Sequence, residues 1–303
     1  MRTRPASRGS TVLPRARWRG SMAAMLLSID SLVDDARRGD AAACAALVEH
    51  IQDDIYRLSM RMLAVREDAE DATQEILFKV VRGLGTFRGE SSFRTWVWRI
   101  GVNHLLRARR SSREEVCSFE ALDQVLGQGR ERAALSAGEI SPEVRVLADE
   151  VRLSCTHAML LSMDRDHRLA FILGTVFELD SHAAAEILEI SPAAFRKRLE
   201  RARTRLDGWM QRQCGLVNAS AGCSCIRQVA LAKEHGHIDM ESRPYSTHPS
   251  RERQVSLVQL RQTTAELDAF ARELMNHPRY ATPEAVTTKV RELIAERGLR
   301  AFD

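Results

Sequence analysis

The residues best suited to chemistry lie in the last third of the chain, where thiols and imidazoles gather. Cys214 is followed by Cys223 and Cys225, which flank a single serine, and then by His235 and His237. Thiolate and imidazole are the ligands that zinc prefers, usually four in a tetrahedron, and soft thiolates also suit Cu(I). Cys214, Cys223, Cys225 and His235 are therefore a candidate ligand set for zinc or copper.

A regulatory thiol pair and plain packing are the two alternatives for these cysteines. The Cys-x-Cys spacing is tighter than that of a common zinc knuckle, and reactive thiols also occur in close pairs. Three cysteines in a small helical cap would instead pack as apolar side chains. The remaining cysteines, at 44, 117 and 155, are scattered, which is unlike a secreted disulfide framework and favours the cytoplasm.

Arginine dominates two other segments. The first, "FRTWVWRIGVNHLLRARR" at 93–110, interleaves aromatic and basic residues and follows the small-residue loop "RGESS". Such a surface suits single-stranded nucleic acid, because arginines follow the backbone while a loop or aromatic surface accepts unstacked bases. The second, "SPAAFRKRLERARTRL" at 191–206, places Arg196, Lys197, Arg201 and Arg203 where phosphates and base edges can be met.

A helix-turn-helix must position the second basic segment. Ser181 is expected to cap a short helix, "EIS" to make a tight turn, and Ser191 to cap a second helix with Pro192 at its first position. A second helix with a basic outer face can lie in the major groove of DNA with its first residues at base edges. Its inward face is predicted to hold Phe195, Leu199, Ala202 and Leu206.

The rest of the chain is also predicted to be helical. Apolar residues recur at three- and four-residue steps from 28 to 110, with a break at Gly39 and a helix N-cap at Asp40. Residues 111–141 lack this period and are predicted to be a linker. A second helical block is predicted to start at Pro142 and run to Gln213, followed by an extension, 214–303, that ends in helices at about 255–276 and 282–297.

Two of these blocks resemble one known family. The string "DAEDATQEILFKVVRGLGTFRGESSFRTWVWRI" is similar to region 2 of the extracytoplasmic-function (ECF) sigma factors of the sigma-70 family. The string "LSMDRDHRLAFILGTVFELDSHAAAEILEISPAAFRKRLERAR" resembles their region 4. The resemblance implies an all-α protein with a region 2 domain at 28–110, a flexible linker at 111–141, a region 4 helix-turn-helix domain at 142–213 and a cysteine-bearing helical extension at 214–303.

The resemblance also implies roles for individual residues. Core-polymerase binding, through the β′ clamp helices, would fall on Asp68, Asp71, Gln74, Glu75 and Phe78. Minus-ten recognition would fall on Arg88, Gly89, Glu90, Ser91, Ser92, Arg94, Trp96, Asn103, Arg107 and Arg110. Minus-thirty-five recognition would fall on Ser191, Ala193, Ala194, Arg196, Lys197 and Arg201.

The expected function is that of an alternative sigma factor, a promoter-specificity subunit and not an enzyme, with no cofactor required beyond the zinc or copper considered above. Its partners would be promoter DNA and core RNA polymerase, through the β′ clamp helices and the β flap, with an anti-sigma protein left open. The chain departs from the family at "LSMDRDHR", where the family usually has Leu-Pro, and in the next helix, which is more apolar than usual.

Bulk properties agree with this interpretation and limit the alternatives. The 45 basic and 41 acidic residues nearly balance, and the apolar run from Met22 to Leu27 is too short for a membrane span, so a cytoplasmic protein is expected. Residues 1–27 are either a disordered basic arm or a stretch before the true start at Met22 or Met25. A conventional helix-turn-helix regulator and an enzyme that uses the thiols remain as alternatives, but the first leaves the region 2 match unexplained and the second lacks a phosphate loop or nucleophile elbow.

Overall fold

The protein is all α-helical in the part of the chain that its computed structural model describes, which comprises residues 29–132, 140–248, 269–275 and 277–297. The one pairing of β type among these residues is an isolated bridge between Cys214 and Cys223. The predicted all-α class is therefore confirmed. The suggested basic arm, residues 1–27, and most of the helix expected at 255–276 lie outside the described residues.

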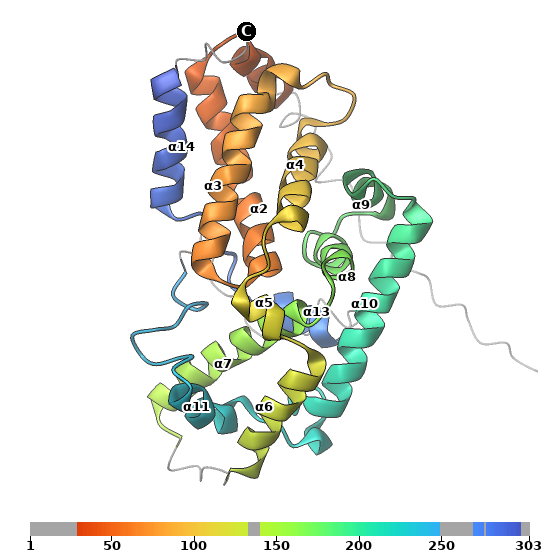
Figure 1. Ribbon diagram of the computed structural model, residues 1–303, viewed down its shortest axis with the longest axis vertical. Coiled ribbons are helices and arrows are strands. Elements are labelled where there is room, and N and C mark those ends of the chain that lie inside the picture. Colours follow the sequence, from red (N-terminus) through yellow and green to blue (C-terminus); the bar gives the residue numbers. More distant parts are fainter. Residues whose placement is uncertain (1–28, 133–139, 249–268, 276, 298–303) are drawn as a thin grey trace, which may run out of the picture.

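The first bundle contains a short helix at residues 29–37, whose Val33 and Ala36 are buried, and three longer helices (Figure 1): α2 (Ala41–Leu63), α3 (Arg66–Gly83) and α4 (Phe93–Arg107). Asp40 caps α2 as predicted, and its carboxylate accepts hydrogen bonds from the backbone of Ala42 and Ala43. A short 3₁₀ turn, η1 (Leu84–Thr86), leads from α3 into the loop before α4. The apolar positions three and four residues apart meet in one core, which includes Leu47, Ile55, Leu58, Ile76, Val97 and Leu105.

The second bundle consists of α7 (Pro142–Leu161), α8 (Arg165–Phe171), the π-helical turn η3 (Ile172–Val176), α9 (Ser181–Leu188) and α10 (Pro192–Gln213). Helix α7 begins at Pro142 and α10 at Pro192 after the Ser191 cap, both as the sequence predicted. Ser141 caps α7. One boundary was predicted wrongly, because Asp180 rather than Ser181 caps α9. The short carboxylate of Asp180 reaches the backbone of His182 and Ala183, so α9 begins one residue earlier than expected.

The segment between the bundles is not free of regular structure, contrary to expectation. It contains α5 (Ser112–Val116) and α6 (Phe119–Glu131). Phe119 and Leu126 of α6 are buried and join a core with Trp209 of α10. The sequence hid this helix because its buried face consists of few large residues, two of its positions being glycine.

The C-terminal extension runs back over both bundles. Helix α11 (Cys225–Glu234), which follows the short turn η4 (Ala219–Ala221), packs on α7 and α6, and α13 (Ala269–Met275) packs on α10. The last helix, α14 (Glu284–Arg297), returns to the first bundle and lies against α2 and α3, on the side of α3 away from α4 (Figure 1). Val290 and Ile294 of α14 are buried in the core of that bundle. Among the described residues, none of the helices is long and apolar enough to span a bilayer.

Candidate nucleic-acid and polymerase interface

An acidic stripe runs along the free face of α3. Asp68, Asp71 and Glu75 are exposed and follow one another at steps of three and four residues. Partial burial, together with the neighbouring acids Asp71 and Glu67, raises the pKa of Asp68 above its ordinary value. Of the other predicted polymerase contacts, Gln74 and Phe78 are half-buried at the border of the stripe, where the Arg82 guanidinium lies 5.8 Å from the Phe78 ring centre.

The predicted minus-ten loop stands out from the same bundle, between η1 and α4. Arg88, Gly89 and Glu90 are exposed, and Gly89 has a φ of 73°, which a residue with a side chain rarely adopts. Ser91 is half-buried. Ser92 is exposed but also caps α4, because its hydroxyl accepts a hydrogen bond from the backbone of Thr95 at 3.1 Å. The loop is therefore held at its C-terminal end by a helix cap and is open at its tip.

The aromatic residues on either side of this loop, Phe87, Phe93 and Trp96, pack against one another. Trp96 is half-buried, with ring centres 5.3 Å from Phe87 and 6.0 Å from Phe93. A side chain at Gly83 would press on the Trp96 ring, since a Cβ there would lie 3.3 Å from it. Trp96 is thus half-buried and packed against Phe87, Phe93 and Gly83.

A groove of about 500 Å³ separates α3 from α4. Asn103 and Arg107, both predicted DNA contacts, are exposed one helical turn apart on its wall. Lys79 and His104 also line it, and the Lys79 ammonium donates to His104 Nδ1 at 2.7 Å. Burial, and then the charge of Lys79, lower the pKa of His104, which keeps the ring neutral. Lys79 and His104 were not predicted as site residues, although Lys79 lies one helical turn beyond Glu75 on the exposed face of α3.

Other arginines of α4 are engaged elsewhere. Arg94 forms an ion pair with Asp54 of α2 at 3.1 Å. Arg99, for which no role was predicted, donates a hydrogen bond to the backbone carbonyl of Glu186 in α9 of the second bundle. Beside it the Trp98 ring meets the Phe177 ring edge-on, with centres 4.5 Å apart. One face of α4 is thus covered by the second bundle, while the face with the groove stays open. Arg110, the last predicted minus-ten contact, is exposed beyond the end of α4.

The helix-turn-helix predicted in the second bundle is present. Glu189 ends α9 with a left-handed φ of 54°, and α10 starts after the Ser191 cap. Phe195, Ala202 and Leu206 face inward, and Leu199 is half-buried, as expected. Of the predicted minus-thirty-five contacts, Ala194 is half-buried. The others are exposed, namely Ser191, Ala193, Arg196, Lys197 and Arg201.

Arg203 departs from the predicted basic face. It is half-buried and donates to the Thr175 hydroxyl at 3.3 Å, because α10 turns this position towards η3. Of the four predicted basic residues of α10, Arg196, Lys197 and Arg201 are therefore the exposed ones. Arg196, by contrast, is exposed and donates to the Ser181 hydroxyl at 3.2 Å, which links the first turns of the two helices.

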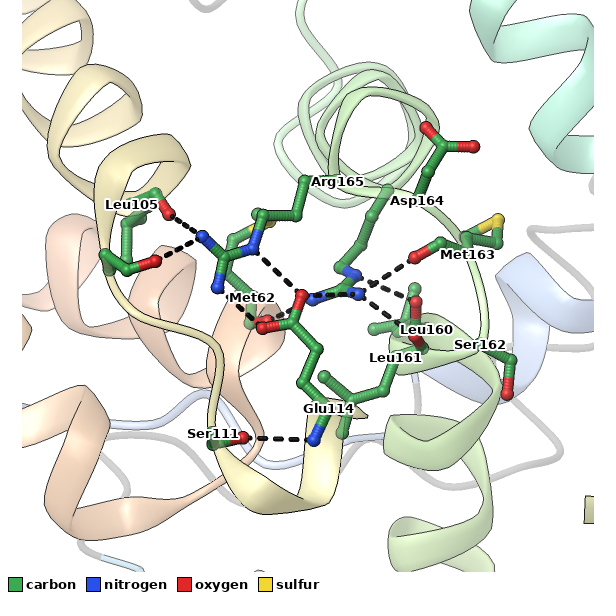
Figure 2. Close-up of polar contacts among 12 residues, drawn as sticks. Met62, Leu105, Ser111, Glu114, Leu160, Leu161, Ser162, Met163, Asp164 and Arg165 are labelled. Carbon is green, nitrogen blue, oxygen red and sulfur yellow. Dashed lines mark hydrogen bonds and ion pairs between the residues drawn. The ribbon is translucent and has the colours of Figure 1, made fainter. Parts of the chain in front are cut away.

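Two arginines of α8 clasp the two bundles together (Figure 2). Arg165 binds the Glu114 carboxylate with two hydrogen bonds, at 2.9 and 2.6 Å, and also donates to the carbonyls of Leu105, Leu106 and Ala108 at the end of α4. These carbonyls have no partner within the helix, so a cation there satisfies them. The clasp thus ties the first bundle to α8 through the linker helix α5.

Arg168 lies deeper in the same clasp and is 1% exposed. It donates to carbonyls at the end of α7, to the carbonyl of Met62 at the end of α2, and lies 3.1 Å from the Glu114 carboxylate. Burial alone would raise the pKa of Glu114, but the hydrogen bonds and charges of Arg165 and Arg168 outweigh it and hold that pKa below its ordinary value. Glu114 is therefore ionised and paired in the folded chain.

The residues proposed as metal ligands are separated into two places. Cys214 ends α10, and Cys223 and Cys225 stand just before and at the start of α11. His235 follows the last residue of α11, about 15 Å along the helix axis from Cys225 at 1.5 Å per residue, so it cannot share an ion with Cys225. In the part of the chain that the structure describes, no three Cys, His, Asp or Glu side chains already stand at metal-ligand spacing.

A buried group of tyrosines and histidines lies where the bundles and the extension meet. His157 of α7 stacks on Tyr245 of the extension with ring centres 4.3 Å apart. The Tyr245 hydroxyl donates to the carbonyl of Ala64, at the end of α2, at 2.8 Å. His248 hydrogen-bonds Tyr56 of α2 at 3.0 Å. The extension is thus connected to both bundles at one buried junction.

Comparisons with known proteins agree with this geometry. A family model described as Sigma-70 region 2 matches residues 47–115. The RNA polymerase sigma-H factor of Pseudomonas aeruginosa is 34% identical over 185 residues, which cover 59% of this chain and 92% of that protein. The ECF RNA polymerase sigma-E factors of Escherichia coli K12 and Salmonella typhimurium are each 32% identical over 186 residues, which cover 59% of this chain and 93% of each relative. The matches therefore span almost the whole of these relatives and leave a large part of this chain without a counterpart in them.

Proposed function

The chain belongs to the ECF sigma factors of the sigma-70 family, and from this premise we propose which of its faces act and how the extension restrains them. It serves as an alternative sigma factor in transcription initiation, associates with core RNA polymerase and promoter DNA, and is not itself an enzyme. A sigma factor works where the polymerase and the chromosome are, so the cytoplasm is the proposed compartment.

The acidic stripe of α3 is the proposed docking face for the β′ clamp helices. Asp68, Asp71 and Glu75 form its charged centre, and Gln74 and Phe78 its half-buried border. The observation that carries this assignment is the separation of charge on one small bundle. Acids occupy the exposed face of α3 as far as Glu75, while the neighbouring groove exposes the cationic side chains of Lys79 and Arg107 and the amide of Asn103. Such separation lets the bundle hold polymerase and DNA at the same time.

The loop at 88–92 and the groove beside α4 are the proposed minus-ten surface. An open loop tip next to an aromatic cluster can accept an unstacked base, and capture of such bases, at about 1–3 kcal/mol each, opposes the cost of unpairing. The exposed first turns of α10 are the proposed minus-thirty-five surface, and the second bundle that carries them is proposed to dock on the β flap.

The arrangement of the two bundles supports a further part of the proposal, that this is a closed form. The two promoter elements are named for positions about 25 base pairs apart, which is about 85 Å of duplex at 3.4 Å per base pair. In the structure α9, which directly precedes the minus-thirty-five helix, packs on α4 of the minus-ten bundle. A chain folded in this way cannot reach both elements, so the bundles must separate on the polymerase.

The extension is proposed to favour the closed form. It packs on α2 and α3 through α14, on α7 through α11 and on α10 through α13. Because it contacts both bundles, separating them requires that some of these contacts break. An anti-sigma protein is a further candidate partner, and α14 would compete with it for the faces of α2 and α3.

The test is run-off transcription by sigma-free core polymerase on a pool of genomic promoter fragments. The full-length chain is compared with a chain ending at Gln213, the last residue of α10, which lacks the extension. We expect discrete transcripts from both and more from the shorter chain. Transcripts from neither, with folding and DNA binding demonstrated, would reject the proposed assignments and favour a conventional repressor or activator.

A charge reversal tests the docking face separately. Asp71→Lys places a cation in the centre of the stripe and is expected to weaken binding to core polymerase by about tenfold or more, since like or mismatched charge at an interface costs several kcal/mol. Glu115→Lys changes an exposed acid on α5, outside the stripe, and serves as the matched control. Equal affinity of the two variants for core polymerase would count against the stripe.

A further inference from the structure

Three histidines are buried where the extension meets both bundles. His157 of α7 is fully buried, and His248 and His277 of the extension are each 5% exposed. The rings of His157 and His277 have centres 4.9 Å apart, and those of His248 and Tyr280 are also 4.9 Å apart. Together with the buried tyrosines around them they form a group that we call the histidine junction: Tyr56, His157, Tyr245, His248, His277 and Tyr280.

The junction has no acceptor for the second N–H of two of its histidines. His157 donates from Nδ1 to the Leu153 carbonyl at 3.0 Å, and His248 meets the Tyr56 hydroxyl through Nδ1. The Nε2 atoms of both rings are buried and have no hydrogen-bond partner among the described residues. A protonated imidazole carries N–H groups on both nitrogens. Charging either ring would therefore leave a buried donor without an acceptor, which is costly.

His277 accepts a proton no more readily. The Thr156 hydroxyl donates to the Leu153 carbonyl at 2.8 Å, so its oxygen accepts from Nε2 of His277. The Nδ1 atom of the neutral ring is then the acceptor that faces the Tyr280 hydroxyl at 3.5 Å. A proton on Nδ1 would turn this acceptor into a donor and place a charge beside the buried ring of His157.

Cations already surround the junction. Arg61 is 4% exposed and lies 5.8 Å from the Tyr280 ring centre, and its Nε and Nη1 have no hydrogen-bond partner in the part of the chain that the structure describes. Arg113 of α5 donates to the Tyr245 hydroxyl at 2.7 Å. The charges of Arg66 at the start of α3 and of Arg152 on α7 also act on the histidines. A further positive charge here would meet repulsion from several sides.

The acids near the junction are occupied. Glu150 is fully buried, and its two oxygens accept from the backbone of Tyr245 and Ser246 at 2.7 and 2.8 Å. Glu67, next to Arg66, is exposed. The remaining nearby acids have partners of their own: Glu70 with Arg66 at 2.7 Å, Glu273 with Arg152 at 3.2 Å, Asp54 with Arg57, and Asp53 with the backbone of Thr282 at 3.0 Å. A charged histidine in the junction would thus have no carboxylate to balance it.

We propose that the histidine junction is a pH-sensitive switch, which holds the extension on both bundles near neutral pH and releases it when the three histidines take up protons. On release, His248 and His277 leave with the extension and His157 is uncovered, so each ring can bind a proton near pH 6.5 as an exposed histidine does. A proton that binds only the released state shifts the equilibrium towards that state. The switch rests on the closed form proposed above, because release of the extension is a step in opening it.

The size of the effect follows from the number of histidines. Contacts that exclude protons are complete above the pKa of the exposed ring and are lost as the pH falls below it. For an exposed pKa of about 6.5, a change from pH 7.5 to 6.0 favours the released state by a factor of about 3.8 per histidine, and therefore by about 50 for three.

Backbone hydrogen exchange of the full-length chain measures the release directly. The amides of Tyr245 and Ser246 donate to the buried Glu150 carboxylate, so they exchange when the extension is released. Their protection factors, corrected for the pH dependence of free amides, are expected to fall about 50-fold between pH 7.5 and 6.0. Protection at the buried Ile55 and Leu58 of α2 is expected to be higher at each pH, because release leaves the bundle folded.

Substitutions separate the histidines from other effects of pH. The double variant His248→Asn/His277→Gln keeps neutral hydrogen-bonding side chains, and its protection factors are expected to fall only about 3.8-fold over the same range, since His157 alone remains. The matched control is His235→Asn, at an exposed position of the extension, which should behave as the unaltered chain does.

Two results of the exchange measurement would overturn the switch. One is a fall in protection of the same size in the unaltered chain and in the double variant. The other is equal protection at Tyr245 and at Leu58 at each pH, which would mean that the junction opens only when the whole chain unfolds.

Run-off transcription with core polymerase then tests the link to function. The ratio of transcripts from the unaltered chain to those from the double variant should rise from pH 7.5 to 6.0, by at most about 14-fold for two histidines. The pH dependence of the polymerase itself cancels in this ratio. A constant ratio would overturn the regulatory role. Absence of transcripts from both chains would reject the proposed promoter and polymerase surfaces, while hydrogen exchange, which needs no polymerase, would still decide whether the junction responds to protons.

Discussion

Arg99 of α4 donates from its Nε to the backbone carbonyl of Glu186 in α9 at 3.1 Å, and its guanidinium lies 3.6 Å from the Glu186 carboxylate. This one arginine therefore joins the proposed minus-ten helix to the first helix of the helix-turn-helix. Both side chains are partly exposed, so the ion pair itself contributes little. Its value lies in the orientation it gives to the apolar contact beside it, between Trp98 and Phe177.

Phe177→Ala is expected to shift the chain towards an open form. It removes the edge-on contact with Trp98, which is worth about 0.5–1.5 kcal/mol beyond its buried area, so the ratio of closed to open chains should fall about 2- to 13-fold. Small-angle scattering should show a larger radius of gyration. Val146→Ala, at an exposed position of α7, is the control and should leave the radius unchanged. A radius unchanged in both variants would mean that this contact does not hold the bundles together.

Arg168→Leu is expected to destabilise the fold by about 3–5 kcal/mol, because it removes one partner of a buried ion pair and leaves helix-end carbonyls without a donor. Urea unfolding of the full chain measures this. Arg198→Leu breaks the more exposed pair with Asp166, at 3.6 Å, and should cost less than about 1 kcal/mol. If the two variants lose similar amounts of unfolding free energy, the buried contacts of Arg168 contribute no more to stability than an exposed ion pair does.

Stability should fall as the pH drops below about 6.5. Burial lowers the pKa of His157 to about 3 and that of His248 to about 4, and it also lowers the pKa of His277. The unfolded chain therefore binds protons that the folded chain excludes, and stability is full above the unfolded pKa and is lost as the pH falls towards the folded values.

Each such histidine should lower the unfolding free energy by about 1 kcal/mol per pH unit below 6.5. Urea unfolding at several pH values between 7.5 and 5 gives the slope. His248→Asn should reduce it, whereas His182→Asn, at an exposed position, should not. A flat profile between pH 7 and 5 would mean that the junction between bundles and extension opens before the histidines are protonated.

Arg107→Ala should weaken binding to a forked minus-ten fragment and reduce its dependence on salt. Loss of one phosphate contact is expected to lower the slope of log affinity against log salt by about 0.7–0.9. Filter binding or fluorescence anisotropy over a salt series measures the slope. Arg212→Ala, an exposed arginine near the end of α10, is the matched control. If both variants change the slope equally, the groove has no particular part in DNA binding.

The linker and the thiols mark the limits of inference from the sequence. The helix α6 was not predicted because its buried residues, Phe119 and Leu126, are too few to set a clear period, and its stability comes from packing on α7 and α11. Cys155 was described as one of the scattered cysteines, yet it borders the same core as Cys214 and Cys223. Nothing in the spacing of α7 indicates this.

What the sequence determined by itself is local. The caps at Asp40 and Ser191, the helix start at Pro142 and the apolar stripes of α2, α3 and α10 were predicted, because each depends on residues within a few positions of one another. The family likewise followed from two strings of neighbouring residues. Only the tertiary structure decided that Glu114 meets Arg165, 51 residues away, that α14 returns to α2 and α3, and that Cys155, Cys214 and Cys223 border one core. These contacts arise from the packing of whole helices, whose relative positions no short-range pattern specifies.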